Sequence, residues 1–142
     1  PEDYARCNNI WDMARQPDMT HKWYDELVSG KRLIFVCALA GEFIAEGALV
    51  FDTGDPDYTI AGQRVYLSRL IVKQEYRHRG IGGVLVDHLC AHAQSLGYAE
   101  ITVGVNCDNH IARRLYAQKG FATVLYEGAD EYGHYVKLLK GL

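Results

Sequence analysis

The segment Tyr76–Gly83, with the sequence YRHRGIGG, places two arginines and a histidine among three glycines, at the point where an apolar run stops and a helical pattern begins. A turn between a strand and a helix N-terminus leaves main-chain N–H groups free and adds the positive end of the helix dipole. The glycines carry no Cβ that would keep an anion away from the backbone. Arg77 and Arg79 add forked donors that fit phosphate oxygens. The segment therefore predicts a pyrophosphate site; the alternative is a solvated basic turn whose glycines serve geometry alone.

The two neighbours of this segment are predicted to be a strand over residues 65–72 and a helix over residues 82–96. Apolar side chains three or four positions apart indicate the helix, and Gly97 marks its end. The strand closes on three apolar residues, Leu70–Val72, which suggests burial on both faces at the centre of a sheet.

The rest of the chain predicts further helices and strands. Helices are expected over residues 3–15, from a cap at Asp18 or Thr20 to Gly30, and from a cap at Asp108 or Asn109 to Gly120. Strands are expected over residues 33–40 and 42–51, joined at Gly41 as a hairpin, and over 101–105, 121–127 and 132–139, with loops over 52–62 and 128–133. The order ααβββαβαββ predicts a mixed α/β fold in a single domain that spans residues 1–142.

Composition excludes several classes of protein. The chain has 142 residues, of which 49% are hydrophobic and 23% charged, as expected for one globular domain. No apolar run approaches the roughly 20 residues of a membrane span, and no signal peptide is visible, so we expect a soluble cytoplasmic protein without a membrane partner. The net charge of −3 argues against a dedicated nucleic-acid binder.

Neither the cysteines nor the histidines show a metal-binding pattern. The four cysteines are scattered without a CxxC pair, and the six histidines lack an HExxH arrangement, so we expect reduced thiols and no metal. A dinucleotide fingerprint that began at Gly80 would meet Leu85 where its third glycine belongs, and no GxxxxGK[ST] occurs. Sites for NAD and for ATP of the P-loop type are therefore disfavoured.

Two motifs resemble those of the GNAT acyltransferase superfamily. The run Leu70–Gly82 is similar to that family's strand and pyrophosphate loop, in which Arg77, Gly80 and Gly82 supply Arg/Gln-x-x-Gly-x-Gly/Ala. The run Asn109–Phe121 resembles its Asn-x-x-Ala-x-x-x-Tyr helix with the Gly-Phe that follows. Together the matches cover roughly residues 65 to 125.

The resemblance implies a fold and a donor. The fold would be a mostly antiparallel central sheet, splayed at its middle strands, with about four helices; the strand that usually precedes the first helix of the family is not visible here. Acetyl-CoA would be the acyl donor, attacked directly by an acceptor amine in a ternary complex without a covalent enzyme intermediate. The residues implied in cofactor binding are Leu70, Ile71, Val72, Arg77, His78, Arg79, Gly80, Ile81, Gly82, Gly83, Asn109 and Tyr116.

The resemblance also assigns catalytic roles. Tyr116 stands at the family's position for the acid that protonates the leaving thiolate, although it would also suit a core residue packed beside Leu115. The acceptor amine must lose a proton before it attacks, so a base is required. No carboxylate stands in the segment 65–68, where some members place one, and Glu46 on the preceding strand is the substitute; the alternative for Glu46 is an ordinary outward-facing side chain.

The acceptor is expected to be a small-molecule or peptide amine. The resemblance places its site between the N-terminal helices and two loops rich in acidic residues, namely Asp52, Asp55, Asp57, Glu127, Asp130 and Glu131. Such a set favours a cation, although solvated loop charge is the commoner explanation. The sequence supports an acetyl-CoA-dependent N-acetyltransferase, with a non-catalytic acyl-CoA-binding or sensory module as the alternative, and it leaves a homodimer open.

Overall fold

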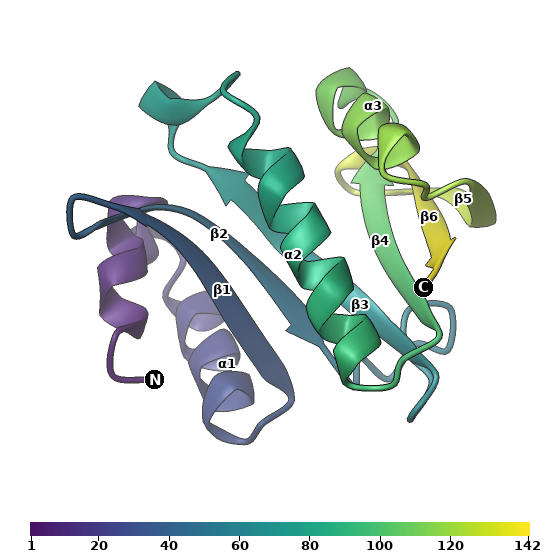
Figure 1. Ribbon diagram of the computed structural model, residues 1–142, viewed down its shortest axis with the longest axis horizontal. Helices are drawn as coiled ribbons and strands as arrows, with labels where there is room; N and C mark the ends of the chain where they lie inside the picture. The colour runs from purple at the N-terminus through teal and green to yellow at the C-terminus, as the bar shows by residue number, and fades with distance from the viewer.

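A six-stranded sheet with the order β1-β2-β3-β4-β6-β5 forms the centre of the computed structural model, which describes residues 1–142 (Figure 1). The strands are β1 (Arg32–Leu39), β2 (Glu42–Val50), β3 (Arg64–Val72), β4 (Glu100–Asn106), β5 (Thr123–Asp130) and β6 (Gly133–Gly141). The helices are α1 (Pro17–Val28), α2 (Ile81–Ser95) and α3 (His110–Gln118), with short 3-10 helices η1 (Tyr4–Asn9), η2 (Met13–Arg15) and η3 (Gln74–Tyr76). Only β3 and β4 run parallel; the other neighbours are antiparallel. The mixed, mostly antiparallel α/β fold predicted from the sequence is confirmed.

The two faces of the sheet are covered by different segments (Figure 1). On one face α2 packs on β2 and β3 over the main core, which includes the fully buried Leu49, Leu67 and Leu89. On the other face the N-terminal helices pack around a smaller cluster built on Trp11 and Trp23, whose rings meet edge to face at 5.4 Å. None of the helices combines the length and the apolar character needed to cross a membrane.

The first hairpin follows its sequence signal closely. Ala40 and Gly41 join β1 to β2 with φ angles of 52° and 83°. Two successive positive φ angles belong to a tight hairpin turn whose twist matches that of the strands. The predicted hairpin is confirmed, with strands that end one residue earlier at Leu39 and Val50.

The helical segment at the N-terminus differs from its prediction. The continuous helix over residues 3–15 is wrong: η1 and η2 occupy this range and are separated around Trp11. Side chains compete for the main chain here, since Asn8 accepts a hydrogen bond from the Met13 N–H at 3.0 Å and Asp12 accepts one from the Ala14 N–H at 3.1 Å. Such local bonds stabilise turns in place of a regular α-helix.

Helix α1 begins earlier than predicted, because its first residue, Pro17, precedes both predicted caps, Asp18 and Thr20. Gln16 is its N-cap, without a side-chain cap bond, and Pro17 holds the first helical position, where the missing N–H costs nothing. The Thr20 hydroxyl donates a hydrogen bond to the Gln16 carbonyl at 2.7 Å, so Thr20 is a residue of the first helical turn and not its cap. The predicted end is confirmed, because Gly30 follows the helix with φ of 80°.

The last hairpin is longer than predicted. Strands β5 and β6 pair up to Asp130 and Gly133, so most of the expected loop over 128–133 is strand. Asp130 accepts a hydrogen bond from the Tyr132 N–H at 2.8 Å, and Gly133 takes φ of 111°, which together close a short turn. The acidic residues of this region therefore lie on a hairpin instead of a wide loop.

Strand β3 changes partner along its length, and this opens the sheet. It pairs with β4 only over Arg64–Tyr66, and Figure 1 shows the two strands diverging beyond that point. Its register with β2 slips beside Arg69, whose φ of 58° marks a bulge. The expectation that Leu70–Val72 is buried on both faces is wrong, because these residues lie half-buried along the opening.

Candidate active site

A pocket of about 700 Å³ lies in the opening between β3, α2 and α3. The end of β3 forms one wall, the turn into α2 a second, and one side of α3 the third. Every residue predicted to bind the cofactor lines this pocket except Arg79. The two motifs, about 25 residues apart in the sequence, therefore meet at one place in the fold. No group of three or more His, Cys, Asp or Glu side chains is arranged to hold a metal ion.

The turn into α2 presents a row of free donors to the pocket. The main-chain N–H groups of residues 78–83 donate no hydrogen bond within the protein, and the first helical bond runs from Val84 N–H to the Gly80 carbonyl at 3.2 Å. His78 and Gly80 take φ angles of 64° and 80°, which turn successive N–H groups toward one side. Such a row at a helix N-terminus is a ready-made anion site.

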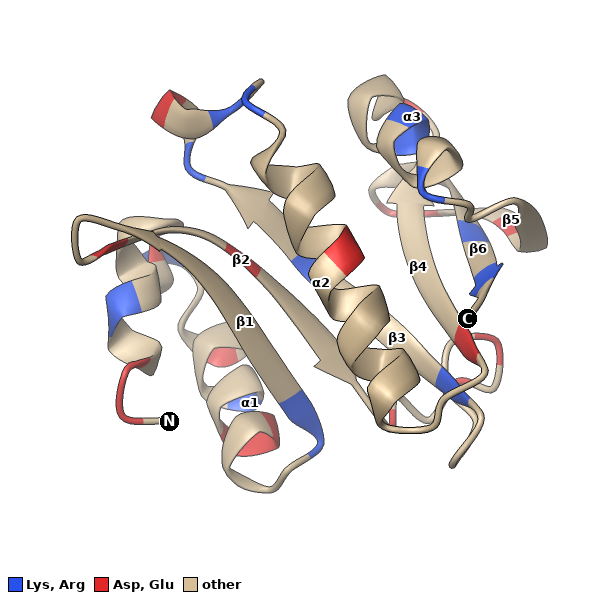
Figure 2. Ribbon diagram, viewed as in Figure 1, with Lys and Arg blue, Asp and Glu red and all other residues tan.

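The two arginines of the turn have different positions. Arg77 lines the pocket, and its Nε donates to the Val72 carbonyl at 2.9 Å, which ties the turn to the end of β3. Arg79 points elsewhere: its guanidinium lies over the Tyr76 ring at 5.5 Å and lines a separate, mostly apolar pocket of about 410 Å³ on the β1 side of α2. Basic residues mark both this turn and α3, on the two sides of the opening (Figure 2).

The glycines of the turn are required for two different reasons. Gly80 caps α2 in the left-handed region, which is cheap only for glycine. Gly82 has no such constraint, and a Cβ on it would make only ordinary contacts of 3.6 to 3.9 Å with side chains such as Leu115. Packing alone would tolerate alanine at position 82, so the contacts within the chain do not require glycine there.

The end of β3 offers unpaired main chain to the pocket. Beyond Tyr66 this strand has no partner on its β4 side, whereas on its other side Ile71 is paired with Glu46 of β2. The peptide groups of Leu70–Val72 that face the opening are therefore free to bond an extended ligand, in the manner of an added strand.

Tyr116 joins the pocket to the core. The residue is 5% exposed, its ring meets Phe121 edge to face at 5.3 Å, and it belongs to the main core cluster. Burial raises the pKa of its hydroxyl well above the ordinary value, and the nearby Tyr66 adds to this effect. Tyr116 is therefore a packed residue that keeps its proton and lines the pocket, so the two interpretations of this tyrosine are compatible.

Asn109 caps helix α3. Its side-chain oxygen accepts a hydrogen bond from the Ala112 N–H at 3.1 Å, as the motif predicts. The other predicted cap, Asp108, lies outside this bond. The helix turns Ile111, Leu115 and Gln118 toward the pocket, and these residues were not among the predicted site. Their mutual spacing of four and three residues, which places them on one side of the helix, was the signal that would have identified them.

Glu46 lies apart from this pocket. It is 4% exposed on β2, with Cys7, Trp11 and Arg69 as its near neighbours beneath the N-terminal segment. Burial raises its pKa above the ordinary value, and the charge of Arg69 partly opposes this effect. It is not an outward-facing side chain, and no carboxylate lines the 700 Å³ pocket.

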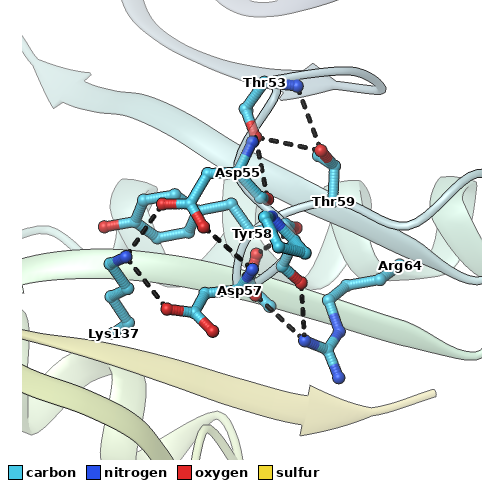
Figure 3. Close-up of polar contacts among 9 residues, drawn as sticks. Thr53, Asp55, Asp57, Tyr58, Thr59, Arg64 and Lys137 are labelled. Carbon is cyan, nitrogen blue, oxygen red and sulfur yellow. Dashed lines mark hydrogen bonds and ion pairs between the residues drawn. The ribbon is translucent and has the colours of Figure 1, made fainter.

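The acidic loop before β3 is largely engaged within the protein (Figure 3). Lys137 of β6 bonds Asp55 at 2.8 Å and Asp57 at 3.0 Å. The Lys137 bond lowers the pKa of Asp55 below its ordinary value, while the two carboxylates raise the pKa of Lys137 despite its burial. Two of the six acidic residues expected to attract a cationic acceptor thus already hold a cation of the chain itself.

One pocket is lined by a strand that parts from its parallel neighbour, by a row of free amides at a helix N-terminus and by Tyr116, which is the arrangement expected of an acyl-transfer enzyme of the GNAT type. The chain belongs to the acetyltransferase (GNAT) family, whose family model matches residues 2–121. It is an N-acetyltransferase, and the resemblance drawn from its two motifs is confirmed.

Solved structures with low sequence identity share the fold. An aminoglycoside 6'-N-acetyltransferase complexed with coenzyme A matches with a TM-score of 0.74 and 14% identity, covering 99% of this chain and 91% of that one. The paia N-acetyltransferase of Thermoplasma acidophilum, in complex with coenzyme A, gives 0.68 and 18%, covering 99% and 94%. A GNAT family acetyltransferase of Elizabethkingia anophelis with acetyl-CoA bound gives 0.65 and 14%, covering 88% and 85%. No curated protein sequence matches this chain.

Proposed function

We propose that this N-acetyltransferase transfers the acetyl group of acetyl-CoA to a primary amine by direct attack within a ternary complex. The observation that carries the proposal is the row of unbonded N–H groups over residues 78–83, which faces the same 700 Å³ pocket as the free edge of β3. A diphosphate linked to a chain of amides has the chemistry that such a surface would bind. Three similar structures hold coenzyme A or acetyl-CoA, which supports the same ligand here.

Different residues of the pocket would bind different parts of acetyl-CoA. The amides from His78 to Gly83 would hold the pyrophosphate, and Arg77 would add charge while it anchors the turn. The peptide groups of Leu70–Val72 would bond the pantetheine amides. Asn109, whose side-chain oxygen already serves as a cap, would contribute its amide donor, and Arg79 would act through its charge from the far side of the turn.

The chemistry needs an oxyanion donor, an acid and a base. The acceptor nitrogen attacks the thioester carbon, and the N–H of Ile71 would stabilise the charge that develops on the carbonyl oxygen. The carbon–sulfur bond then breaks, and Tyr116 would give its proton to the departing thiolate. A phenol of pKa above about 10 remains protonated at neutral pH, so it is available for this transfer.

Glu46 remains the proposed base for the proton that the acceptor nitrogen loses. A buried carboxylate with a raised pKa has the basicity that this task requires near neutral pH. It lies across the β2–β3 pair from Ile71, beyond the strand that would hold the thioester. A proton would therefore reach it through water or an intervening group.

A non-catalytic acyl-CoA-binding module is the second candidate, favoured by the lack of a carboxylate in the pocket. Thermal unfolding with acetyl-CoA, followed by a thiol-release assay with a panel of primary amines, separates the two. Ligand at about 100 times its Kd stabilises the folded state by about 2.7 kcal/mol, or roughly 5 to 10 °C in Tm for a chain of this size. We expect this shift together with amine-dependent release of thiol. A shift without thiol release supports the binding module, and no shift at millimolar acetyl-CoA contradicts both.

A further inference from the structure

A second polar pocket lies on the opposite face of the sheet from α2. It measures about 410 Å³, and its walls come from the loop before β3, from β3, β4 and β6, and from the turn of the last hairpin. Tyr66 belongs to this face, because its neighbours Val65 and Leu67 both point into the core beneath α2. Tyr66 is also the last residue of β3 that pairs with β4, so it lies where the sheet opens. Strand β3 therefore borders both pockets: Tyr66 lines the second pocket where the β3–β4 pairing ends, and Leu70–Val72 line the 700 Å³ pocket beyond that point.

Tyrosine rings dominate the walls of this pocket, which we call the tyrosine pocket. Four line it, namely Tyr58, Tyr66, Tyr132 and Tyr135. The rings of Tyr58 and Tyr66 lie 4.4 Å apart at 37°, and a Cβ on Gly104 would collide with the Tyr58 hydroxyl. The backbone of β4 thus makes room for one of these rings. Surfaces of this kind bind flat rings and cations through their π faces.

The charges of the tyrosine pocket suit a single positive charge. Lys137 donates hydrogen bonds to Asp55 and Asp57, and its Nζ also lies 4.9 Å from the centre of the Tyr58 ring (Figure 3). Asp130 is the remaining carboxylate of the lining, and it accepts a hydrogen bond from the Tyr132 N–H. One carboxylate without a cationic partner, beside a set of rings, matches a monoamine with a flat body better than it matches a polycation.

We propose that the tyrosine pocket receives the acceptor and that its preferred substrates are primary monoamines carrying an aromatic ring. This inference rests on the proposed acetyl transfer and names the substrate class of the same reaction. The ring would lie among the tyrosines, and the amine would point through the opening toward Tyr66 and Tyr116. Engagement of Asp55 and Asp57 by Lys137 removes the charge that a polycation would need.

The test measures thiol release from acetyl-CoA with 2-phenylethylamine, n-butylamine, spermidine and kanamycin. A ring that stacks on tyrosine adds binding energy, so kcat/KM for 2-phenylethylamine should exceed that for n-butylamine and for both polycations about tenfold or more. Equal or better turnover of n-butylamine, spermidine or kanamycin overturns the preference and leaves acetyl transfer intact. Acetyl-CoA binding without turnover of 2-phenylethylamine also overturns it. Failure of acetyl-CoA to bind contradicts the proposed function itself.

Two variants link the preference to this pocket. Tyr132 is 79% exposed at the hairpin turn, so Tyr132→Ala should fold normally and lower kcat/KM for 2-phenylethylamine about fivefold or more, with n-butylamine unchanged. Tyr24→Ala, at a tyrosine of α1 that is 41% exposed and lies outside both pockets, is the matched control and should change neither value. Lys137→Met should raise the turnover of spermidine relative to 2-phenylethylamine, because it releases two carboxylates. If Tyr132→Ala leaves the ratio of kcat/KM for 2-phenylethylamine to kcat/KM for n-butylamine unchanged, the assignment of the ring to this pocket is contradicted.

Discussion

Tyr116 packs in the core and is also the residue proposed as the catalytic acid. Its ring packs in the core against Phe121, which fixes its orientation, and the residue also lines the 700 Å³ pocket. Because packing sets the rotamer, the hydroxyl would need no ordering when the donor binds. The same burial raises the pKa of the hydroxyl, which would keep the proton in place until a thiolate forms.

Tyr116→Phe is expected to lower kcat about a hundredfold or more, because general acid catalysis contributes about 10² to 10⁴ in rate. The Kd for acetyl-CoA should change little, since the ring and its packing are kept. Steady-state kinetics and calorimetric titration measure the two effects. Tyr98→Phe, at a half-buried tyrosine outside the pocket, is the control and should leave both unchanged. Full activity in Tyr116→Phe would remove this residue from the acid role.

At the scale of elements, the turn from β3 into α2 combines two kinds of constraint. The left-handed cap at Gly80 is needed by the chain itself, whereas the space above Gly82 is not filled by protein at close range. A glycine inside the first turn of a helix is unfavourable by roughly 1 kcal/mol relative to alanine. Its presence therefore indicates that something other than stability acts at this position.

Gly82→Ala separates stability from binding. The added methyl meets side chains only at ordinary contact distance, so we expect the unfolding free energy to rise by up to about 1 kcal/mol. The same methyl would obstruct a diphosphate on the adjacent amides and raise the Kd for acetyl-CoA about tenfold. Urea unfolding and titration measure the two quantities, and Val84→Ala, at an exposed position of the same helix, serves as control. If Gly82→Ala raises the unfolding free energy but leaves the Kd for acetyl-CoA unaltered, the pyrophosphate binds elsewhere.

At the scale of the whole molecule, the sheet separates two different environments. The face under α2 is an apolar core, whereas the face under the N-terminal segment encloses charged groups. There Glu46 lies near Arg69, whose guanidinium stacks on the rings of Trp11 and Trp23 at 4.8 and 4.7 Å. A carboxylate sealed in this way links the stability of the whole fold to pH.

Glu46→Gln is expected to change the pH dependence of stability in a defined direction. The native pKa of Glu46 lies above its unfolded value, so its contribution is fully present below the unfolded value of about 4.3 and is lost as pH rises through the native one. The glutamine variant lacks this loss, and its unfolding free energy should gain on that of the parent between pH 5 and pH 8. Urea unfolding of both proteins at the two pH values measures the difference.

The same variant examines the proposed base. If Glu46 accepts the acceptor's proton, kcat/KM should fall and the acidic limb of its pH profile should disappear. A stability difference that stays constant with pH would contradict burial of the charge, and an unaltered rate profile would remove Glu46 from the catalytic proposal.

Local sequence signals were sufficient for the parts of the fold that depend on local geometry. Glycine at position 41, asparagine at 109 and glycine at 80 each meet a backbone requirement within a few residues, and each stands where the motif or turn predicted it. Local signals gave a wrong prediction for the N-terminal segment. Its apolar residues are spaced as in a helix, but the side chains of Asn8 and Asp12 accept hydrogen bonds from the backbone and stabilise turns. Side-chain competition of this kind is not visible in periodicity.

The sequence by itself determined the class of fold and predicted an anion site at the start of α2 beside the helix of Tyr116, since both motifs carry their geometry in consecutive residues. Only the tertiary structure decided how β3 leaves β4, that Lys137 engages Asp55 and Asp57, and that Glu46 is sealed beneath Trp11. Lys137 lies 80 residues or more from its two partners, so no local pattern records the contact. The bulge at Arg69 likewise depends on the register of two strands, which is set when the sheet assembles.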